Sequence, residues 1–462
     1  MTLFTNNHSF HHLFLFLLLI TFLHLFSSTA ALGVNYGMIA DNLPSPTEVA
    51  NFIKTQTIFD SVKIFDSNPD VLRAFANTNI SVSVTVANGE IPSLTTVRAA
   101  RRWVNAHIRP FHPQTKIKYI IVGNEVLLLN NLAEINNLLP AMKCLNRALH
   151  NSQIQDIKVT SAHALNIFNG LTVPSLARFR IDYAKSFFAP LLLFHRRTKS
   201  PFMINPYPYF ELNAIGNKLD FALFKRNPGL FDGHSGKTYT NAFDALLDKT
   251  FSAMSAIGCG DVEIVIGETG WPSQGDGGNL VATIDNALSY NGNLVREILS
   301  GNGTPLMPNR TFETYIFGLF NENQKPGPLA EKNWGLFRPD FTPVYNAGVL
   351  RNGRPVPTPT QPQPTPSPAT PVPSGKRFCV PKPGVTDAQL QSNLDYACSQ
   401  GTNCSPIQPG GPCAEPPTTR SRATFAMNSF YRSKGEVDSA CDFSGTAQIT
   451  TVNPSYGNCH YV

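Results

Sequence analysis

The stretch Ile117-Lys-Tyr-Ile-Ile-Val-Gly123 is a short β-rich run that stops at the polar pair Asn124-Glu125. Similar runs recur along the chain, with helix-like stretches such as 95–108 and 138–151 between them. They lie at residues 33–37, 61–66, 81–87, 157–162, 202–206, 262–267 and 314–320. Eight β/α units in roughly 320 residues predict an α/β fold, a closed (β/α)8 TIM barrel.

An open, doubly wound sheet is the alternative arrangement of such units. Its phosphate-binding loop, Gly-x-Gly-x-x-Gly after the first strand, does not occur in this sequence, so a dinucleotide site is not expected. Neither a Gly-x-Ser-x-Gly elbow nor a His-Glu-x-x-His zinc motif occurs. We expect no cofactor and no metal, and we expect the isolated His163 and His195 to be structural.

A proline-rich segment at 355–374 separates two parts of different composition. Proline alternating with Thr, Gln and Ser cannot build a core, so this segment predicts an extended spacer and a target for O-glycosylation. We expect a large domain at 32–350, a linker at 351–377 and a small domain at 378–462.

The cysteines are concentrated in the small domain, which holds six of the eight in the chain. A dense, even set in a short segment predicts a disulfide-rich domain, although the sequence alone allows fifteen pairings. Zinc is the weaker interpretation, because His460 is the one nearby partner of the required kind. We expect Cys144 and Cys259 to be free thiols.

The N-terminal residues indicate secretion. An apolar run from Leu13 to Phe26 is followed by the small residues 27–31, the pattern of a signal peptide at 1–31, with an uncleaved anchor as the alternative. We expect no membrane span in the mature chain and an extracellular or cell-wall location, with the vacuole as the alternative. Glycan acceptor triplets begin at Asn79, Asn302, Asn309 and Asn403.

The charge is mild: a formal net charge of +6 is spread over 462 residues. Because no dense basic run occurs, a nucleic-acid partner is not expected. Weak basicity would favour retention on an acidic wall matrix. We expect the chain to be a monomer.

Two carboxylates occupy matching places in the predicted barrel. Glu125 follows the fourth strand and Glu268 follows the seventh, and the active site of such barrels lies at the carboxyl ends of the strands. These strands stand on opposite sides of the barrel, so the two side chains can face each other. Glycoside hydrolysis needs such a pair, one carboxyl as proton donor and one as nucleophile. The like charge of a neighbouring carboxylate would raise the pKa of the donor.

Four longer motifs of the large domain are similar to those of a known enzyme family. The large domain resembles glycoside hydrolase family 17, the plant endo-β-1,3-glucanases and their relatives, over nearly all of residues 32–347. The motifs are Gly33-Val-Asn-Tyr-Gly37, Val122-Gly-Asn-Glu-Val126, Gly267-Glu-Thr-Gly-Trp-Pro-Ser273 and Phe320-Asn-Glu-Asn-Gln-Lys325. The resemblance implies that Glu125 is the acid/base, that Glu268 is the nucleophile and that Asn124 binds the sugar 2-hydroxyl.

The resemblance also implies active-site roles for Glu322, Lys325 and Glu331. Glu322 and Lys325 follow the eighth strand, so both can reach the rim, where a lysine would help to keep Glu268 ionised. A surface ion pair is the alternative for these three residues.

Three aromatic residues stand at strand ends and have two possible roles. Tyr36 ends the first strand and Tyr207 follows the sixth, where tyrosines can stack on sugars or hydrogen-bond the nucleophile. Barrel packing is the alternative for both. Trp271 either lines a subsite or packs the loop that follows Glu268.

The small domain resembles the plant X8 module, carbohydrate-binding module family 43. The resemblance rests on the spacing of Cys398, Cys404 and Cys413 and on the stretches 425–431 and 441–445. It implies the disulfides Cys379–Cys441, Cys398–Cys404 and Cys413–Cys459, and it implies binding to β-1,3-glucan. Phe378 stands where the family usually has Trp, which weakens stacking if that ring contacts glucan and changes little if it packs. A stabilising or targeting appendage without sugar affinity is the alternative.

These expectations combine into one functional prediction, which is retaining endo-hydrolysis of β-1,3-glucan such as callose or fungal wall glucan. Two alternatives stay open. A transglycosylase would pass the glycosyl group to another sugar instead of water, and a non-catalytic wall protein would bind glucan through both domains.

Overall fold

The computed structural model describes two stretches of the chain. They are residues 31–351, apart from 171, 172, 217 and 277, and residues 377–461, apart from 383–384, 400–401, 409, 415–417, 435, 437, 444, 451–453 and 456–458. The chain divides into two compact units, residues 1–360 and 361–462. Nearly all of the expected signal peptide and linker lies outside the described residues, and the expected domain bounds stay predictions.

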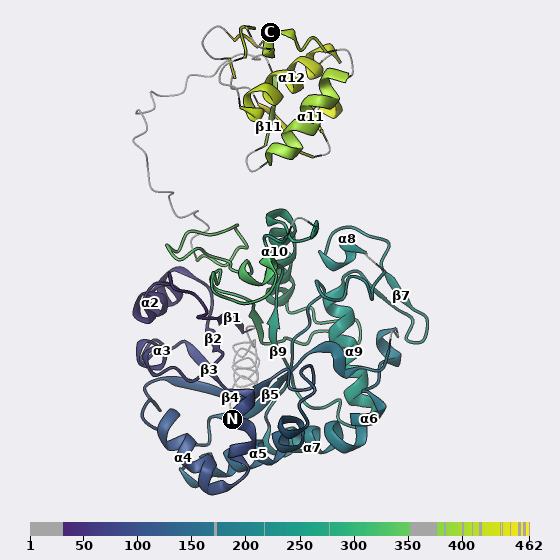
Figure 1. The fold of residues 1–462 in the computed structure, drawn as a ribbon. Helices are drawn as coiled ribbons and strands as arrows, with labels where there is room; N and C mark the ends of the chain where they lie inside the picture. The colour runs from purple at the N-terminus through teal and green to yellow at the C-terminus, as the bar shows by residue number, and fades with distance from the viewer. Residues whose placement is uncertain are drawn as a thin grey trace, which may run out of the picture. The chain divides into compact units, whose positions relative to one another are not determined.

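Eight parallel strands close into a barrel in the first unit, in the order β1-β10-β9-β6-β5-β4-β3-β2 (Figure 1). The TIM-barrel prediction is therefore confirmed, and each strand overlaps the run of sequence that predicted it. The strands are β1 (Leu32–Tyr36), β2 (Ser61–Ile64), β3 (Ser81–Val86), β4 (Lys116–Asn124), β5 (Lys158–His163), β6 (Phe202–Ile204), β9 (Ile264–Thr269) and β10 (Thr314–Ile316).

The helices form a ring around the outside of the strands (Figure 1). Several begin where sequence chemistry predicts, because a Ser, Thr or Asn side chain accepts a hydrogen bond from the first turn, as Ser45 does before α2 and Thr96 before α4. The helices are α2 (Pro46–Gln56), α3 (Pro69–Ala74), α4 (Val97–His107), α5 (Leu132–Asn151), α6 (Ile181–Tyr183), α7 (Ala189–Thr198), α8 (Leu219–Ala222), α9 (Ala242–Ala256) and α10 (Ile284–Ser300).

Strand residues alternate between two cores, because successive side chains point to opposite faces. On β4, Ile120 and Val122 join the large core between strands and helices, whereas Tyr119 and Ile121 fill the barrel interior. Both faces of each strand are thus buried, which explains why the sequence shows apolar runs instead of apolar–polar alternation. The polar groups needed for chemistry are left to the strand ends.

A small hairpin interrupts the β/α repeat and has no counterpart in the sequence prediction. Antiparallel strands β7 (Leu230–Asp232) and β8 (Lys237–Tyr239) lie between β6 and α9. Asp232 accepts hydrogen bonds from the backbone N–H groups of Ser175, His234 and Ser235. This buried carboxylate therefore fixes both the tight turn and the loop that follows β5.

The second unit packs two helices, α11 (Asp387–Ser399) and α12 (Thr419–Ser433), against a two-stranded sheet of β11 (Phe378–Pro381) and β12 (Ala447–Thr450). Its disulfides join Cys379 to Cys441, Cys398 to Cys404 and Cys413 to Cys459, the pairs that the X8 resemblance implies. Cys144 and Cys259 of the first unit are free.

Phe378 packs in this unit and does not present its ring to solvent. The side chain is 2% exposed, lies in a core with Phe425 and Phe430, and has the Arg432 guanidinium 5.2 Å from its ring centre. Of the two roles considered for the substituted ring, the structure therefore supports packing.

Candidate active site

The two predicted carboxylates line one cavity at the carboxyl ends of the barrel strands. Glu125 follows the last residue of β4, and Glu268 lies near the end of β9. The cavity holds about 700 Å³, and Asn124, Tyr207 and Glu322 also line it. Closure of the barrel therefore brings together residues that are far apart in the sequence.

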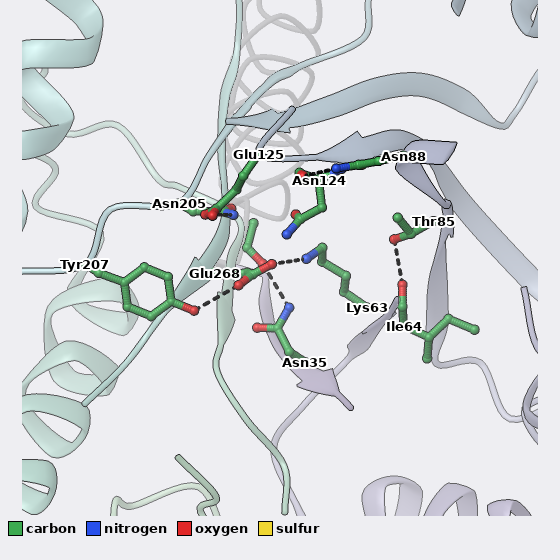
Figure 2. Close-up of polar contacts among 11 residues, drawn as sticks. Asn35, Lys63, Ile64, Thr85, Asn88, Asn124, Glu125, Asn205, Tyr207 and Glu268 are labelled. Atoms are coloured by element: carbon green, nitrogen blue, oxygen red, sulfur yellow. Dashed lines mark hydrogen bonds and ion pairs between the residues drawn. The ribbon is translucent and has the colours of Figure 1, made fainter. Parts of the chain in front are cut away.

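Glu268 is a buried carboxylate with both oxygen atoms occupied (Figure 2). The Lys63 ammonium lies 2.6 Å from Oε1, and the Tyr207 hydroxyl donates a hydrogen bond of 2.9 Å to Oε2. Lys63 is itself fully buried, so this ion pair is shielded from water. A cation on one oxygen and a hydroxyl donor on the other fix the orientation of the carboxylate, as a nucleophile requires.

Glu125 has the opposite electrostatic character. Burial, reinforced by the negative charge of Glu268, raises its pKa to about 7, although the hydrogen bond from Asn205 and the charge of Lys63 act in the other direction. The Asn205 amide donates to Oε1 at 2.9 Å. A carboxyl group with a raised pKa thus lies beside a carboxylate that is paired with a lysine, the arrangement expected of an acid and a nucleophile.

The backbone of Glu125 is in the left-handed region, with φ of 54°. Residues other than glycine rarely adopt this backbone conformation, and backbone strain of this kind is concentrated at functional sites. The Glu125 N–H is held by the Ala162 carbonyl at 2.9 Å, so hydrogen bonding to β5 maintains the turn.

Asn88 holds Asn124 by its backbone and leaves its side chain free for other contacts. The Asn88 Oδ1 accepts a hydrogen bond of 2.8 Å from the Asn124 N–H, and the Asn88 amide donates to the Asn124 carbonyl at 3.0 Å. The buried Oδ1 of Asn124 has no partner in the described part of the chain. Asn124, which the family resemblance assigns to the sugar, thus has a fixed backbone and a side chain with an unmet acceptor at the cavity (Figure 2).

Glu322, Lys325 and Glu331 all line the cavity, on the loop after β10. Glu322 accepts a hydrogen bond of 2.8 Å from the Ile39 N–H, and Lys325 pairs with Glu331 at 3.0 Å. The cation that pairs with Glu268 is Lys63, whereas Lys325 reaches the cavity, as expected, and pairs there with Glu331.

Not every predicted aromatic residue reaches the cavity. Tyr36 is 1% exposed, packs edge-on against Phe320 and does not line the cavity, so the structure gives it the packing role. Trp271 is also fully buried, with its indole N–H donated to the Val281 carbonyl at 2.8 Å, and packs the loop. Tyr207 does reach the nucleophile. The two predicted structural histidines, His163 and His195, are buried, and burial lowers the pKa of each to about 3.

Sequence reasoning missed three residues that organise the site, namely Lys63, Asn88 and Asn205. Lys63 had a usable signal, because it lies between Val62 and Ile64 in the β-rich run 61–66 and a buried strand seldom carries an unpaired lysine. Asn88 and Asn205 had none, since their role depends on contacts with residues at the ends of other strands. No cluster of three or more His, Cys, Asp or Glu side chains suited to a metal occurs among the described residues.

Comparison with known proteins identifies the class that this fold and site define. Residues 32–349 match the family Glycosyl hydrolases family 17, and residues 377–448 match the X8 domain. The chain belongs to glycosyl hydrolase family 17 and is a glycosidase.

The relatives cover nearly the whole chain. A protein of Triticum aestivum named glucan endo-1,3-beta-glucosidase is 47% identical over 93% of this chain and 94% of its own length. A glucan endo-1,3-beta-D-glucosidase of Olea europaea is 42% identical over 97% of each chain. Among solved structures, the β-1,3-glucanase and pollen allergen CJP38 of Cryptomeria japonica is 45% identical with a TM-score of 0.65, covering 68% of this chain and 98% of its own.

Because the ion pair between Lys63 and Glu268 is buried, we expect its disruption to lower the stability of the fold strongly. Lys63→Met should lower the free energy of unfolding by about 3–5 kcal/mol, because Glu268 is left buried without its counter-ion. Combining it with Glu268→Gln should restore part of the loss, since the orphaned charge is removed as well. Urea unfolding at neutral pH measures both changes.

Lys325→Met is the matched control, because it breaks a partly exposed pair in the same cavity. Its cost should be about 1 kcal/mol or less. Equal losses for the two lysine variants would contradict the role assigned to burial.

Proposed function

We propose that this chain hydrolyses internal β-1,3-linkages of β-glucan with retention of configuration, with Glu125 as acid/base and Glu268 as nucleophile. The observation that carries the proposal is the contrast between the carboxyl groups: Glu125 has a pKa raised to about 7, whereas Glu268 is paired with Lys63 at 2.6 Å. The names of the wheat and olive relatives support β-1,3-glucan as the substrate.

The reaction takes two steps. Glu268 attacks the anomeric carbon while Glu125 gives its proton to the glycosidic oxygen, so the leaving chain departs as an alcohol and a glycosyl ester forms on Glu268. Glu125, now ionised, takes a proton from water, whose oxygen attacks the same carbon and releases Glu268. Two inversions at one carbon give retention.

The surrounding residues bind the sugar in this proposal. Asn124 and the rim residues Glu322, Lys325 and Glu331 offer donors and acceptors to hydroxyl groups, while Tyr207 orients the nucleophile. Product lengths decide whether water is the acceptor, because products longer than the substrate require transfer to a second glucan.

The second unit is proposed to bind β-1,3-glucan and so raise the local substrate concentration for the catalytic unit. Secretion to the cell wall is part of the same proposal, and the three disulfides support it because such bonds persist in oxidising compartments. Among the described residues, no helix is long and apolar enough to cross a membrane.

Substitution of the two carboxylates should separate their roles. Glu268→Ala should abolish release of reducing sugar from a linear β-1,3-glucan, and Glu125→Ala should reduce it about 10²–10⁴-fold. An aryl laminaribioside with a good leaving group needs no proton donor, so it should restore the first step in Glu125→Ala only. The exposed Glu48→Ala is the control, and undiminished turnover in Glu268→Ala would refute the assignment.

The pH profile should reflect the raised pKa of Glu125. The acid is needed in its protonated form, so kcat/KM should fall as the pH rises through about 7, the value to which burial and Glu268 raise this pKa. Asn205→Ala removes a hydrogen bond that stabilises the carboxylate, so it should move this alkaline limb to higher pH. An unmoved limb in Asn205→Ala, or a flat profile in the wild type, would contradict the mechanism.

Removal of the second unit should weaken binding to the polymer while leaving the chemistry intact. A chain that ends at Arg351 should bind insoluble β-1,3-glucan less than the full chain does, with equal kcat on soluble oligosaccharides. Sedimentation with the polymer measures the bound fraction. The isolated segment 377–462 should sediment as well, and retention no greater than that of albumin would exclude the binding role.

A further inference from the structure

Two polar side chains that line the cavity are not used by the proposed mechanism. Glu211 lies on the turn after β6, and Asn166 lies on the loop after β5, within the short 3-10 helix Leu165–Ile167. Both line the same cavity as Glu125 and Glu268. Neither residue belongs to the motifs that identify the chemistry.

Glu211 is a partly buried carboxylate without a hydrogen-bond donor. In the described part of the chain, no residue donates a hydrogen bond to its side chain and no cation comes within ion-pair distance. Burial raises its pKa, and the charge of Lys249 opposes this effect from farther away. Its backbone carbonyl accepts a hydrogen bond of 2.9 Å from the Ile215 N–H, which holds the turn.

Asn166 has a similar unmet acceptor. Its amide donates a hydrogen bond of 3.3 Å to the Leu127 carbonyl, which ties it to the loop that follows Glu125. Its buried Oδ1 has no partner among the described residues. The side chain is therefore held by its donor while its acceptor is unmet.

A buried acceptor without a donor, as the Asn166 Oδ1 is, carries a desolvation cost that most buried polar atoms in proteins avoid. Such atoms in a cavity indicate a ligand that brings donors. Every glucosyl unit of a glucan carries several hydroxyl groups, which donate hydrogen bonds to carboxylate and amide oxygens.

We propose that Glu211 and Asn166 form a specificity-determining subsite that accepts hydrogen bonds from the hydroxyls of a glucosyl unit beyond the two units joined by the scissile bond. The inference rests on the proposed function and extends it to the preference for longer substrate chains. Because the subsite does not touch the reacting atoms, it adds affinity for longer chains and leaves the chemical step unchanged.

The test compares laminari-oligosaccharides of increasing length on the full chain. For Glu211→Ala and Asn166→Ala, kcat/KM should fall about tenfold to a hundredfold on the long oligosaccharides, the loss expected for a hydrogen bond to a charged or buried acceptor. On the shortest oligosaccharide that is cleaved, which does not reach the subsite, kcat/KM should stay the same. The loss should appear in KM, with kcat unchanged.

Glu211→Gln separates the contribution of the hydrogen-bond acceptor from that of the negative charge. It retains a carbonyl acceptor but removes the charge that faces Lys249, so it should recover part of the affinity lost in Glu211→Ala. The exposed Asp220→Asn, an acid farther along the same connection and outside the cavity, is the control and should match the wild type. Thermal unfolding of each variant detects any loss of fold.

The outcomes distinguish failure of the proposed function from failure of the subsite alone. A wild-type chain that cleaves no laminari-oligosaccharide overturns the proposed function and the subsite with it. An active wild type with equal losses at every chain length, or with no loss in the alanine variants, overturns the subsite alone. Binding of a long laminari-oligosaccharide to Glu268→Ala, with and without Glu211→Ala, gives the same comparison without turnover: equal affinities overturn the subsite.

Discussion

Hydrogen bonding between β1 and β10 closes the sheet into a barrel, and the geometry of the active site depends on this closure. The pairing joins Leu32 to Thr314 and Val34 to Ile316, residues far apart in the sequence. Once the first and last strands are joined, the carboxyl ends of all eight strands lie on one rim. Residues that follow different strands then line a single cavity, and no strand end is free to move independently.

Closure also explains how a lysine can be buried inside the barrel. Lys63 on β2 and Glu268 on β9 come from strands that are not neighbours in the sheet, so their contact runs across the barrel interior. Two buried charges carry a large desolvation cost, which their attraction offsets only if the geometry is good. The barrel supplies that geometry, and the ion pair lies beside Glu125, whose pKa is raised by burial and by the charge of Glu268.

The sequence was informative wherever the determinant is local. Short β-rich runs predicted all eight strands, and the polar residues at the ends of β4 and β9 predicted the carboxylate pair. The prediction failed where the determinant is a contact between strands. The pairing of Lys63 with Glu268, the hydrogen bonds between Asn88 and Asn124 and the packing of Tyr36 on Phe320 are contacts between distant parts of the chain, which periodicity does not encode. The hairpin β7–β8 was missed because each of its short strands contains a charged residue and neither forms an apolar run.

Position relative to the end of a strand also explains why two tyrosines at the rim make different contacts. Tyr36 and Tyr207 both lie at the carboxyl ends of barrel strands, yet Tyr36 packs against Phe320 while Tyr207 hydrogen-bonds Glu268. Tyr36 is the last residue of β1 and continues its in-and-out alternation, whereas Tyr207 lies past the end of β6, where the turn frees the side chain from that alternation. Residues just beyond a strand can therefore be aimed at the cavity independently of the core, which allows catalytic and binding groups to be added to the rim without repacking the barrel.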